Sequence, residues 1–464
     1  MSKKPDSKGL TLEAIRAVGR LGSEFLAREA ELPRRDLPPE EIASRLGIAL
    51  GPEGRPFGQV VEKLGRVLGA TPSSSSPRFL NQLFAGRESI ATLAEMLVPL
   101  ADTSMYTYKV AGAQVLVERE VLARMLSTVP FPEGEGMFCP GGSLANMTAM
   151  LVARNEVLDG VRDEGFQGER LSVYSSSDSH YSIRKSAGIL GLGRDHVREV
   201  PTDGDGAIKA AELERMIEED RRDGRLPFFV NATAGTTVLG AVDPIAEIAE
   251  IARAQGLWLH VDGALAGPVL LSGTYRQLLE GVADSDSLTW NAHKMMGVPL
   301  SCSVLLLRRT GLLATHLGEP ANYLFQADGD ELNPGTRSLQ CGRRSDALKL
   351  WALWQQHGDR GLDRKMTRLV DLARYAARVI EEDPVLELAR LPQTVNVCFR
   401  VPGVSSADLC DYLDRQGILK IGHGLVDGES AVRLVCVNPD LDRDRIVRVL
   451  GEIKSAAQAL YDAA

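Results

Sequence analysis

Between residues 171 and 307, short apolar runs rich in β-branched and aromatic residues recur, and helical patterns lie between several of them. The runs are Leu171–Ser175, Pro227–Asn231, Leu257–Val261, Ser287–Trp290 and Cys302–Leu307. One helical pattern covers Asp243–Ala254. Apolar strands that alternate with helices are typical of a largely parallel sheet whose two faces are both covered. The sequence therefore predicts an α/β fold.

The segments on either side of this region have a different character. Residues 1–70 show an amphipathic helical pattern, and the serine-rich stretch Thr71–Pro77 marks a loop. A long helical region follows Arg344, and the last part of the chain has the order strand, helix, strand, helix, which is typical of a small α+β domain. We expect three units: an N-terminal helical segment (1–70), a large domain (71–345) and a C-terminal small domain (346–464).

The composition argues against several classes of partner and site. The 464 residues include 53 Lys plus Arg against 62 Asp plus Glu, a net charge of −9, which argues against nucleic acid or an anionic membrane as the main partner. No apolar run has the length of a membrane span, and the polar N-terminus does not resemble a secretory signal. The six cysteines form no CxxC pair and the seven histidines no HxxxH or HxH spacing. We therefore expect free buried thiols, no metal site and a cytoplasmic location.

An acid and an amine each follow a predicted strand. Asp262 comes directly after Leu257–Val261, at the edge where open α/β sheets bind ligands, and Lys294 lies shortly after Ser287–Trp290. Taken singly, the aspartate is as readily a helix cap and the lysine a solvated turn residue. Together they suit pyridoxal phosphate, because a lysine in an apolar pocket binds the aldehyde and an aspartate keeps the pyridine nitrogen protonated.

Three further motifs fit the same cofactor. The turn Pro140–Ser143 opens a helical run, where free backbone N–H groups and the positive end of the helix dipole bind phosphate, although such a turn is equally an ordinary helix cap. His180 could stack on the face of the ring, although a lone histidine is more often structural. Thr237, in NATAGTT, can offer its hydroxyl to a ring substituent, and a plain turn is its alternative reading.

Seven sequence blocks in one order resemble the pyridoxal-phosphate-dependent group II amino acid decarboxylases, and most closely their glutamate, aspartate and cysteine sulfinate branch. The blocks are PRFLNQLFAG, MFCPGGSLANM, SDSHYSIRKSAGILGLG, NATAGTTVLGAVDP, LHVDGALAG, TWNAHKMMGVPLSCS and NYLFQ…LQCGRR. The resemblance implies a fold type I transferase-like architecture, with a mostly parallel seven-stranded sheet in the large domain, a smaller C-terminal α+β domain and an N-terminal helical segment. It also implies a homodimer with shared active sites.

The resemblance assigns roles to individual positions. The residues it places around the ring are Lys294, Asp262, His180, Ala264, Thr237 and His293. Those it places at the phosphate are Gly142, Ser143, Leu144, Ala145 and Asn291. Lys294, Asp262 and His180 are implied as catalytic. Tyr323 is implied as the group that returns a proton to Cα after carbon dioxide leaves.

Substrate recognition is implied at Gln82, Phe84 and Arg433. Gln82 and Arg433 suit a carboxylate, although Arg433 is also readable as a strand arginine paired with a structural acid. The bulk of Phe84 resembles the branch that acts on shorter substrates. Leu265 and Ala145 depart from the family pattern, because an aromatic residue and a serine are usual there. We therefore expect α-decarboxylation of aspartate or cysteine sulfinate, slightly ahead of glutamate, to β-alanine, hypotaurine or GABA.

Three other outcomes stay open at this point. The same fold serves decarboxylases of neutral or aromatic amino acids, and aminotransferases or oxidative decarboxylases. A catalytically silent binding protein could also keep the fold, because fold alone does not fix function.

Overall fold

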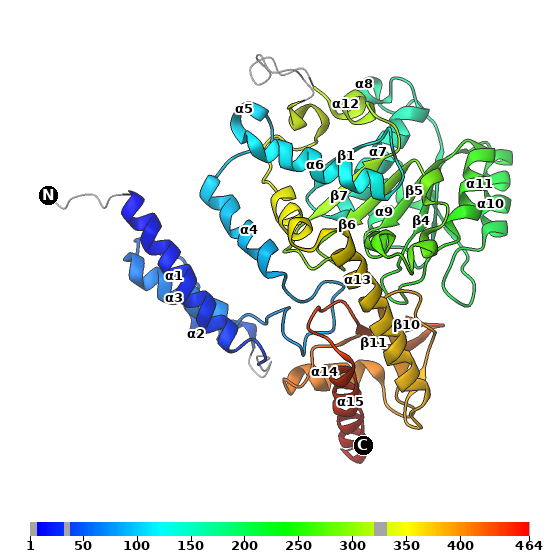
Figure 1. Ribbon diagram of the computed structural model, residues 1–464. Helices are drawn as coiled ribbons and strands as arrows, with labels where there is room; N and C mark the ends of the chain where they lie inside the picture. Colours follow the sequence, from blue (N-terminus) through cyan, green and yellow to red (C-terminus); the bar gives the residue numbers. More distant parts are fainter. Residues whose placement is uncertain (1–6, 32–37, 320–331, 464) are drawn as a thin grey trace.

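A computed structural model describes residues 7–31, 38–319 and 332–463 (Figure 1). Within these residues, seven strands form one sheet in the order β1-β7-β6-β5-β4-β2-β3. They are β1 (Glu135–Cys139), β2 (Leu171–Ser176), β3 (Val197–Val200), β4 (Leu226–Thr233), β5 (Trp258–Gly263), β6 (Ser287–Asn291) and β7 (Ser303–Leu307). β7 runs antiparallel to both of its neighbours, β1 and β6. The strands β6, β5, β4, β2 and β3 run parallel to one another. The predicted α/β class with a mostly parallel sheet is confirmed.

The helices of the large sheet and its flanks follow the alternation that the sequence predicts. They are α4 (Ser89–Ala101), α5 (Tyr108–Ala111), α6 (Ala113–Thr128), α7 (Gly142–Val157), α8 (Val161–Glu164), α9 (Ser182–Ile189), α10 (Ala210–Arg222), α11 (Ile245–Gln255) and α12 (Leu312–Leu317). Two strands of this sheet, β1 and β3, escape the sequence prediction. Each lies at an edge of the sheet, and β3 carries Arg198 and Glu199 in its four residues, so neither shows a continuous apolar run.

Neighbouring residues of each central strand point to opposite faces of the sheet, as the strand period of two requires. In β4, Phe229 packs in one apolar cluster and Val230 in another, and in β7 Leu305 and Leu306 divide in the same way. The first cluster includes side chains of α7, α9 and α12, and the second includes side chains of α6, α10 and α11. Both faces are therefore covered, and α7 lies against the face to which Phe229 points.

The C-terminal part forms a second sheet, of order β10-β11-β9-β8, with all pairs antiparallel. Its elements are β8 (Glu387–Leu388), β9 (Asn396–Arg400), α14 (Ser406–Arg415), β10 (Gly422–Val426), β11 (Glu429–Val435) and α15 (Arg443–Ala463). The long helix α13 (Ala347–Glu381) joins it to the large sheet, since it contacts α4 and α6 as well as β9 and α15 (Figure 1). Gly358 breaks this helix with φ of 58°, a conformation that glycine adopts without steric cost.

The N-terminal helices are α1 (Ser7–Ala27), α2 (Pro39–Leu46) and α3 (Phe57–Gly69), and Figure 1 shows them grouped apart from both sheets. An ion pair between Glu29 and Arg87 (2.7 Å) ties this group to the rest of the chain. The unit boundaries at residues 70 and 345 stay a prediction. Among the residues described, no helix combines the length and the apolar character that a membrane span requires. Five of the six cysteines are buried free thiols, and Cys341 is exposed.

Candidate active site

A cavity of about 210 Å³ lies where β4, β5 and β6 end and α7 begins. Because the carboxyl ends of parallel strands share one edge of a sheet, residues far apart in sequence meet there. Nine of the predicted residues line the cavity: Gly142, Ser143, His180, Thr237, Asp262, Ala264, Asn291, His293 and Lys294. The structure therefore brings together the residues that the sequence singles out for the ring and for the phosphate.

Lys294 and Asp262 reach this cavity from neighbouring strands. Asp262 lies on β5, which pairs in parallel with β6. Lys294 lies in the turn after β6, and its backbone N–H donates to the Asn291 carbonyl (3.1 Å). Burial lowers the pKa of the Lys294 amine below its usual range, and the nearby Asp262 carboxylate opposes this shift. The amine is therefore more readily neutral, and more nucleophilic, than a lysine on the surface.

Hydrogen bonds fix the Asp262 carboxylate, which is 4% exposed. The side-chain amide of Asn146 donates to Oδ2 (2.7 Å), and the backbone N–H of Ala264 donates to Oδ1 (3.1 Å). A buried carboxylate without such donors would be costly, so the two donors account for its presence here.

The two histidines of the cavity are neutral groups at neutral pH. Burial lowers the pKa of His180, and the charges of Lys294 and Lys185 add to this effect while Asp262 opposes it. The N–H of Ser182 donates to Nδ1 of His180 (3.3 Å), which leaves the proton of the neutral ring on Nε2. Burial lowers the pKa of His293 to about 4. An uncharged imidazole suits contact with an aromatic ring.

The phosphate end of the cavity has room and an amide donor. A Cβ placed on Gly142 would lie 2.6 Å from Nδ2 of Asn291, so only glycine leaves this space open. Asn291 lines the cavity, and its side-chain Nδ2 can donate a hydrogen bond to a phosphate oxygen. Together with the cavity-lining Ser143, at the start of α7, and with the amine and carboxylate described above, these residues fit pyridoxal phosphate.

Several predicted residues do not line the cavity. The backbone N–H groups of Leu144 and Ala145 both donate to the Gly141 carbonyl, at 3.1 and 3.2 Å. Gln82 and Phe84 lie in the irregular segment before α4. Tyr323 lies outside the described residues.

Arg433, on β11, forms no ion pair with an acid in the part of the chain that the structure describes. Its terminal nitrogens donate to the backbone carbonyls of Thr237 and Asn81, both at 2.8 Å, and its Nε is buried without a partner among the described residues. Arg433 therefore connects a cavity residue, Thr237, to the segment that carries Gln82.

Sequence reasoning missed four residues that line the cavity: Asn146, Tyr181, Thr233 and Gly235. A signal existed for Asn146, because it is a polar residue inside an apolar helical run, one turn after Gly142 and Ser143. Tyr181 directly follows His180, and Thr233 ends β4, the strand that leads into the NATAGTT motif. Thr233 and Gly235 both lie within the NATAGTT motif, in which only Thr237 was predicted as a site residue.

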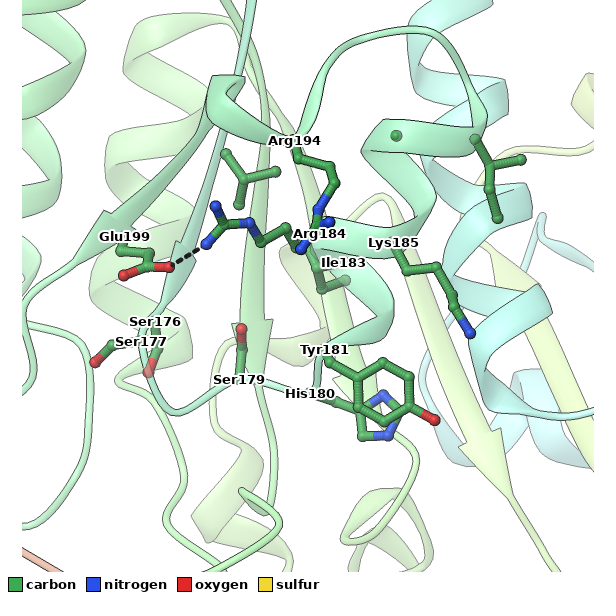
Figure 2. Close-up of a pocket in the computed structure, with 13 residues that line it drawn as sticks. Ser176, Ser177, Ser179, His180, Tyr181, Ile183, Arg184, Lys185, Arg194 and Glu199 are labelled. Atoms are coloured by element: carbon green, nitrogen blue, oxygen red, sulfur yellow. Dashed lines mark hydrogen bonds and ion pairs between the residues drawn. The ribbon is translucent and has the colours of Figure 1, made fainter. Parts of the chain in front are cut away.

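A wider groove of about 700 Å³ adjoins the cavity and shares His180 and Tyr181 with it. Figure 2 shows the cations that line it, Arg184, Lys185 and Arg194. Glu199 is the one carboxylate among the described residues of its lining, and it accepts a hydrogen bond from Arg184 (3.2 Å). The groove beside the cavity is thus positively charged, although the chain as a whole is acidic.

Comparisons with known proteins agree with this site. Residues 39–402 match the pyridoxal-dependent decarboxylase conserved domain. The chain is 42% identical to the cysteine sulfinic acid decarboxylase of Homo sapiens over 366 residues, which cover 78% of this chain and 74% of that protein. It is 38% identical to the acidic amino acid decarboxylase GADL1 of Bos taurus over 439 residues, or 90% and 84% of the two chains.

Among solved structures, mouse CSAD in its apo form superimposes with a TM-score of 0.91 at 35% identity, covering 96% of this chain and 99% of that one. The family predicted from the seven sequence blocks is therefore confirmed, and so are the predicted cofactor and reaction class. The chain belongs to the pyridoxal-phosphate-dependent amino acid decarboxylases.

Proposed function

We propose that this decarboxylase removes the α-carboxyl group of an acidic L-amino acid, and that aspartate or cysteine sulfinate is a better substrate than glutamate. The products are carbon dioxide and β-alanine, hypotaurine or GABA, respectively. The proposal depends above all on one observation, that the Lys294 amine and the Asp262 carboxylate line one cavity in a chain of this family. The names of its relatives, cysteine sulfinic acid decarboxylase and acidic amino acid decarboxylase, support an acidic substrate.

We assign the cofactor contacts from the lining of the cavity. Lys294 binds the aldehyde carbon, and Asp262 holds a proton on the pyridine nitrogen. His180 and Ala264 contact the ring, Thr237 lies at its hydroxyl, and Gly142, Ser143 and Asn291 bind the phosphate. When bound, pyridoxal phosphate supplies a conjugated ring that accepts the electron pair left on Cα as carbon dioxide departs.

The side chains of the protein prepare this step in three ways. Burial keeps more of the Lys294 amine neutral and able to bind an aldehyde. The donors on both oxygens of Asp262 hold the carboxylate in place, where its negative charge can attract a proton on the ring nitrogen. The small cavity leaves room for few water molecules around the reacting atoms, which strengthens each of these interactions.

Two features support an acidic substrate. The cations of the adjoining groove attract an anion towards the cavity, and the Nε of Arg433 is a buried donor with no partner among the described residues. We propose that Gln82 and Arg433 orient the substrate carboxylate and that the bulk of Phe84 favours a short side chain.

Tyr323 is our proposal for the acid that returns a proton to Cα. A proton that the Tyr323 hydroxyl delivers to Cα gives the amine product. A proton delivered to another atom diverts the reaction towards aldehyde. Tyr323→Phe is therefore expected to lower the yield of amine relative to aldehyde. An unchanged amine yield in this variant would exclude the role.

We further propose a cytoplasmic homodimer with shared active sites. One side of α4 exposes Leu93, Met96, Leu97 and Leu100, each about half accessible to solvent. The N-terminal helices also expose apolar side chains, and α3 buries only Val61. Contiguous apolar surface of this kind is typical of a subunit interface. The buried free thiols fit a reducing compartment.

Release of carbon dioxide from a panel of amino acids tests the proposed reaction. Aspartate, cysteine sulfinate and glutamate should release it, whereas aromatic and neutral amino acids should not. Lys294→Ala is the control and should be inactive. If only aromatic or neutral amino acids release carbon dioxide, the protein is a decarboxylase of that substrate class instead. Formation of a keto acid or an aldehyde in place of the amine would favour an aminotransferase or an oxidative decarboxylase. If the protein binds no cofactor, it is a catalytically silent binding protein that has kept the fold.

A further inference from the structure

A chain of buried polar groups extends from Asp262 away from the cavity. Trp258, His260 and Asp262 alternate along β5, so their side chains point to the same face of the sheet, towards α7. Ser287 lies opposite His260 in the β5–β6 pairing, and Asn146 belongs to α7. We call these five residues the Asp262 network.

The hydrogen bonds of the Asp262 network connect its members in one line. The indole Nε1 of Trp258 donates to Ser287 Oγ (2.8 Å), which lies 2.8 Å from Nδ1 of His260. Nε2 of His260 lies 3.1 Å from Oδ1 of Asn146, and Nδ2 of Asn146 donates to Asp262 (2.7 Å). Asn146 Nδ2 also donates to the Ser182 hydroxyl (3.0 Å).

Only one arrangement of protons satisfies all of these contacts. An ionised carboxylate accepts only, so Asn146 must direct its NH₂ to Asp262 and its oxygen to His260. His260 must then carry its proton on Nε2 and accept at Nδ1, which the Ser287 hydroxyl provides. The indole of Trp258 can only donate, and the Ser287 oxygen accepts that bond. Along this line, each member therefore donates towards Asp262, and the second N–H of Asn146 donates to Ser182.

Burial makes this arrangement rigid. His260 and Ser287 are fully buried, and Asn146 is 1% exposed. Burial lowers the pKa of His260 to about 4, although Asp262 opposes the shift, so the ring is neutral in the working range of pH. Unpaired polar groups at this depth are costly, and therefore a change in one member disturbs its neighbours.

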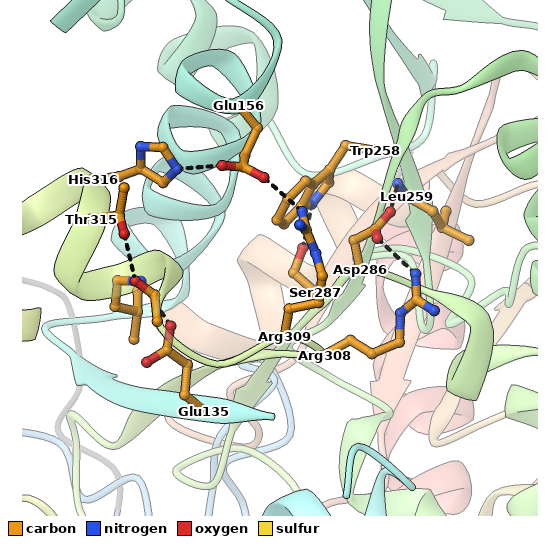
Figure 3. A network of polar contacts seen from close by, with 12 residues as sticks. Glu135, Glu156, Trp258, Leu259, Asp286, Ser287, Arg308, Arg309, Thr315 and His316 are labelled. Carbon is orange, nitrogen blue, oxygen red and sulfur yellow. Dashed lines mark hydrogen bonds and ion pairs between the residues drawn. The ribbon is translucent and has the colours of Figure 1, made fainter. Parts of the chain in front are cut away.

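The outer end of the Asp262 network is closed by charged side chains (Figure 3). The guanidinium of Arg309 lies 5.9 Å from the ring centre of Trp258. Glu156, on α7, holds Arg309 (2.8 Å) and also contacts His316 (2.7 Å). Trp258 itself is 7% exposed and its indole N–H donates to Ser287, so this end of the network is fixed inside the protein.

We propose that Asn146 and His260 are positioning residues for the decarboxylation, which hold the ionised Asp262 in the orientation that keeps the cofactor nitrogen protonated. The inference rests on the proposed role of Asp262. Asn146 lines the cavity, but its proposed role, like that of His260, is to hold the Asp262 carboxylate and not to contact the substrate. Their loss should lower kcat and the affinity for pyridoxal phosphate, and should leave KM for the amino acid unchanged.

Asn146→Leu tests the proposal, because leucine has a similar volume and no hydrogen-bonding group. We expect its apoprotein to bind pyridoxal phosphate about tenfold or more weakly, and kcat to fall by at least a similar factor at constant KM, as is typical when an outer hydrogen-bond partner is lost. Thr148→Val is the matched control. Thr148 is equally buried and lies two residues further along α7, and among the described residues its hydroxyl bonds only to the Leu144 carbonyl of its own helix. Both values should stay within about twofold of the parent protein in this variant.

Two further variants separate the possible failures. Asp262→Asn should itself weaken cofactor binding and abolish turnover; if it does not, the proposed role of Asp262 is wrong. If Asp262→Asn has this effect and Asn146→Leu retains parental affinity and kcat, only the positioning role is refuted. Where Asn146→Leu does not fold, Ser287→Ala removes the hydroxyl further along the line, and a parental kcat in that variant refutes the proposal equally.

Discussion

Replacing Gly142 with alanine tests the phosphate site with a single methyl group. The backbone φ of Gly142 lies outside the left-handed region, so alanine adopts it without strain. The new Cβ would lie 2.6 Å from Nδ2 and 3.0 Å from Oδ1 of Asn291, closer than such atoms approach each other. The side chain of Asn291 must therefore move away from the place where we put the phosphate.

The structure indicates how large the effect should be. Asn291 Oδ1 has no hydrogen-bond partner among the described residues, so its displacement costs the apoprotein little. The bound phosphate, in contrast, loses one hydrogen bond to a charged group, which is worth about 1.5–3 kcal/mol. The dissociation constant of pyridoxal phosphate should rise roughly 10- to 150-fold, while the melting temperature of the apoprotein stays nearly constant.

Titration of the apoprotein with pyridoxal phosphate, followed by the absorbance of the bound cofactor, measures this change. Gly451→Ala is the matched control, because Gly451 lies within α15 and a Cβ there meets no atom within 4 Å. The control should bind the cofactor like the parent protein. An unchanged dissociation constant in Gly142→Ala would show that the phosphate does not sit between α7 and Asn291.

Three other predictions follow from the structure. Glu118 and Arg343 form a buried pair with two hydrogen bonds of 2.7 Å. Glu118→Gln leaves the arginine charge buried and should lower the free energy of unfolding, measured in urea, by about 3–5 kcal/mol, and adding Arg343→Met should recover part of this loss. A loss below about 1 kcal/mol in Glu118→Gln would contradict the prediction. Burial raises the pKa of the thiols of Cys139, Cys398, Cys410 and Cys436 to about 12, so a thiol reagent at pH 8 should modify none of these four in the native protein and should label Cys341 first. Burial lowers the pKa of Lys294 below 10.5, so the neutral amine already predominates at a lower pH. The rate of cofactor capture by the apoprotein should therefore rise with pH and level off below pH 10.5, and a rate that still rises there would refute the shift.

The sequence predicts the centre of the fold better than its edges. The strands β4, β5 and β6 are buried on both faces, so each contains enough apolar and aromatic residues to be recognised as a buried strand. An edge strand has fewer neighbours and less need of apolar side chains, and β3 accordingly contains Arg198 and Glu199. Its strand character comes from pairing with β2, which no local pattern in β3 reveals.

The same distinction holds for the site. Asp262 and Lys294 are recognisable because each lies close to the end of an apolar strand, a feature that short-range sequence shows. Asn146 acts on Asp262 from 116 residues away in sequence, and His260 meets Asn146 across 114 residues. Such contacts arise only when α7 packs on the sheet, so the predicted site contains the groups that carry the chemistry and lacks those that hold them in place.

The register of β5 against β6 links the fold to the reaction. Side chains of β5 alternate between the two faces, so Leu259 and Val261 pack on one side while His260 and Asp262 face α7. A shift of one residue would turn Asp262 into the apolar cluster and His260 away from Asn146. The pairing of His260 with Ser287, through the hydrogen bond between their side chains, opposes that shift. The contact that orients Asp262 therefore also helps to keep it on the face of the sheet where Lys294 lies.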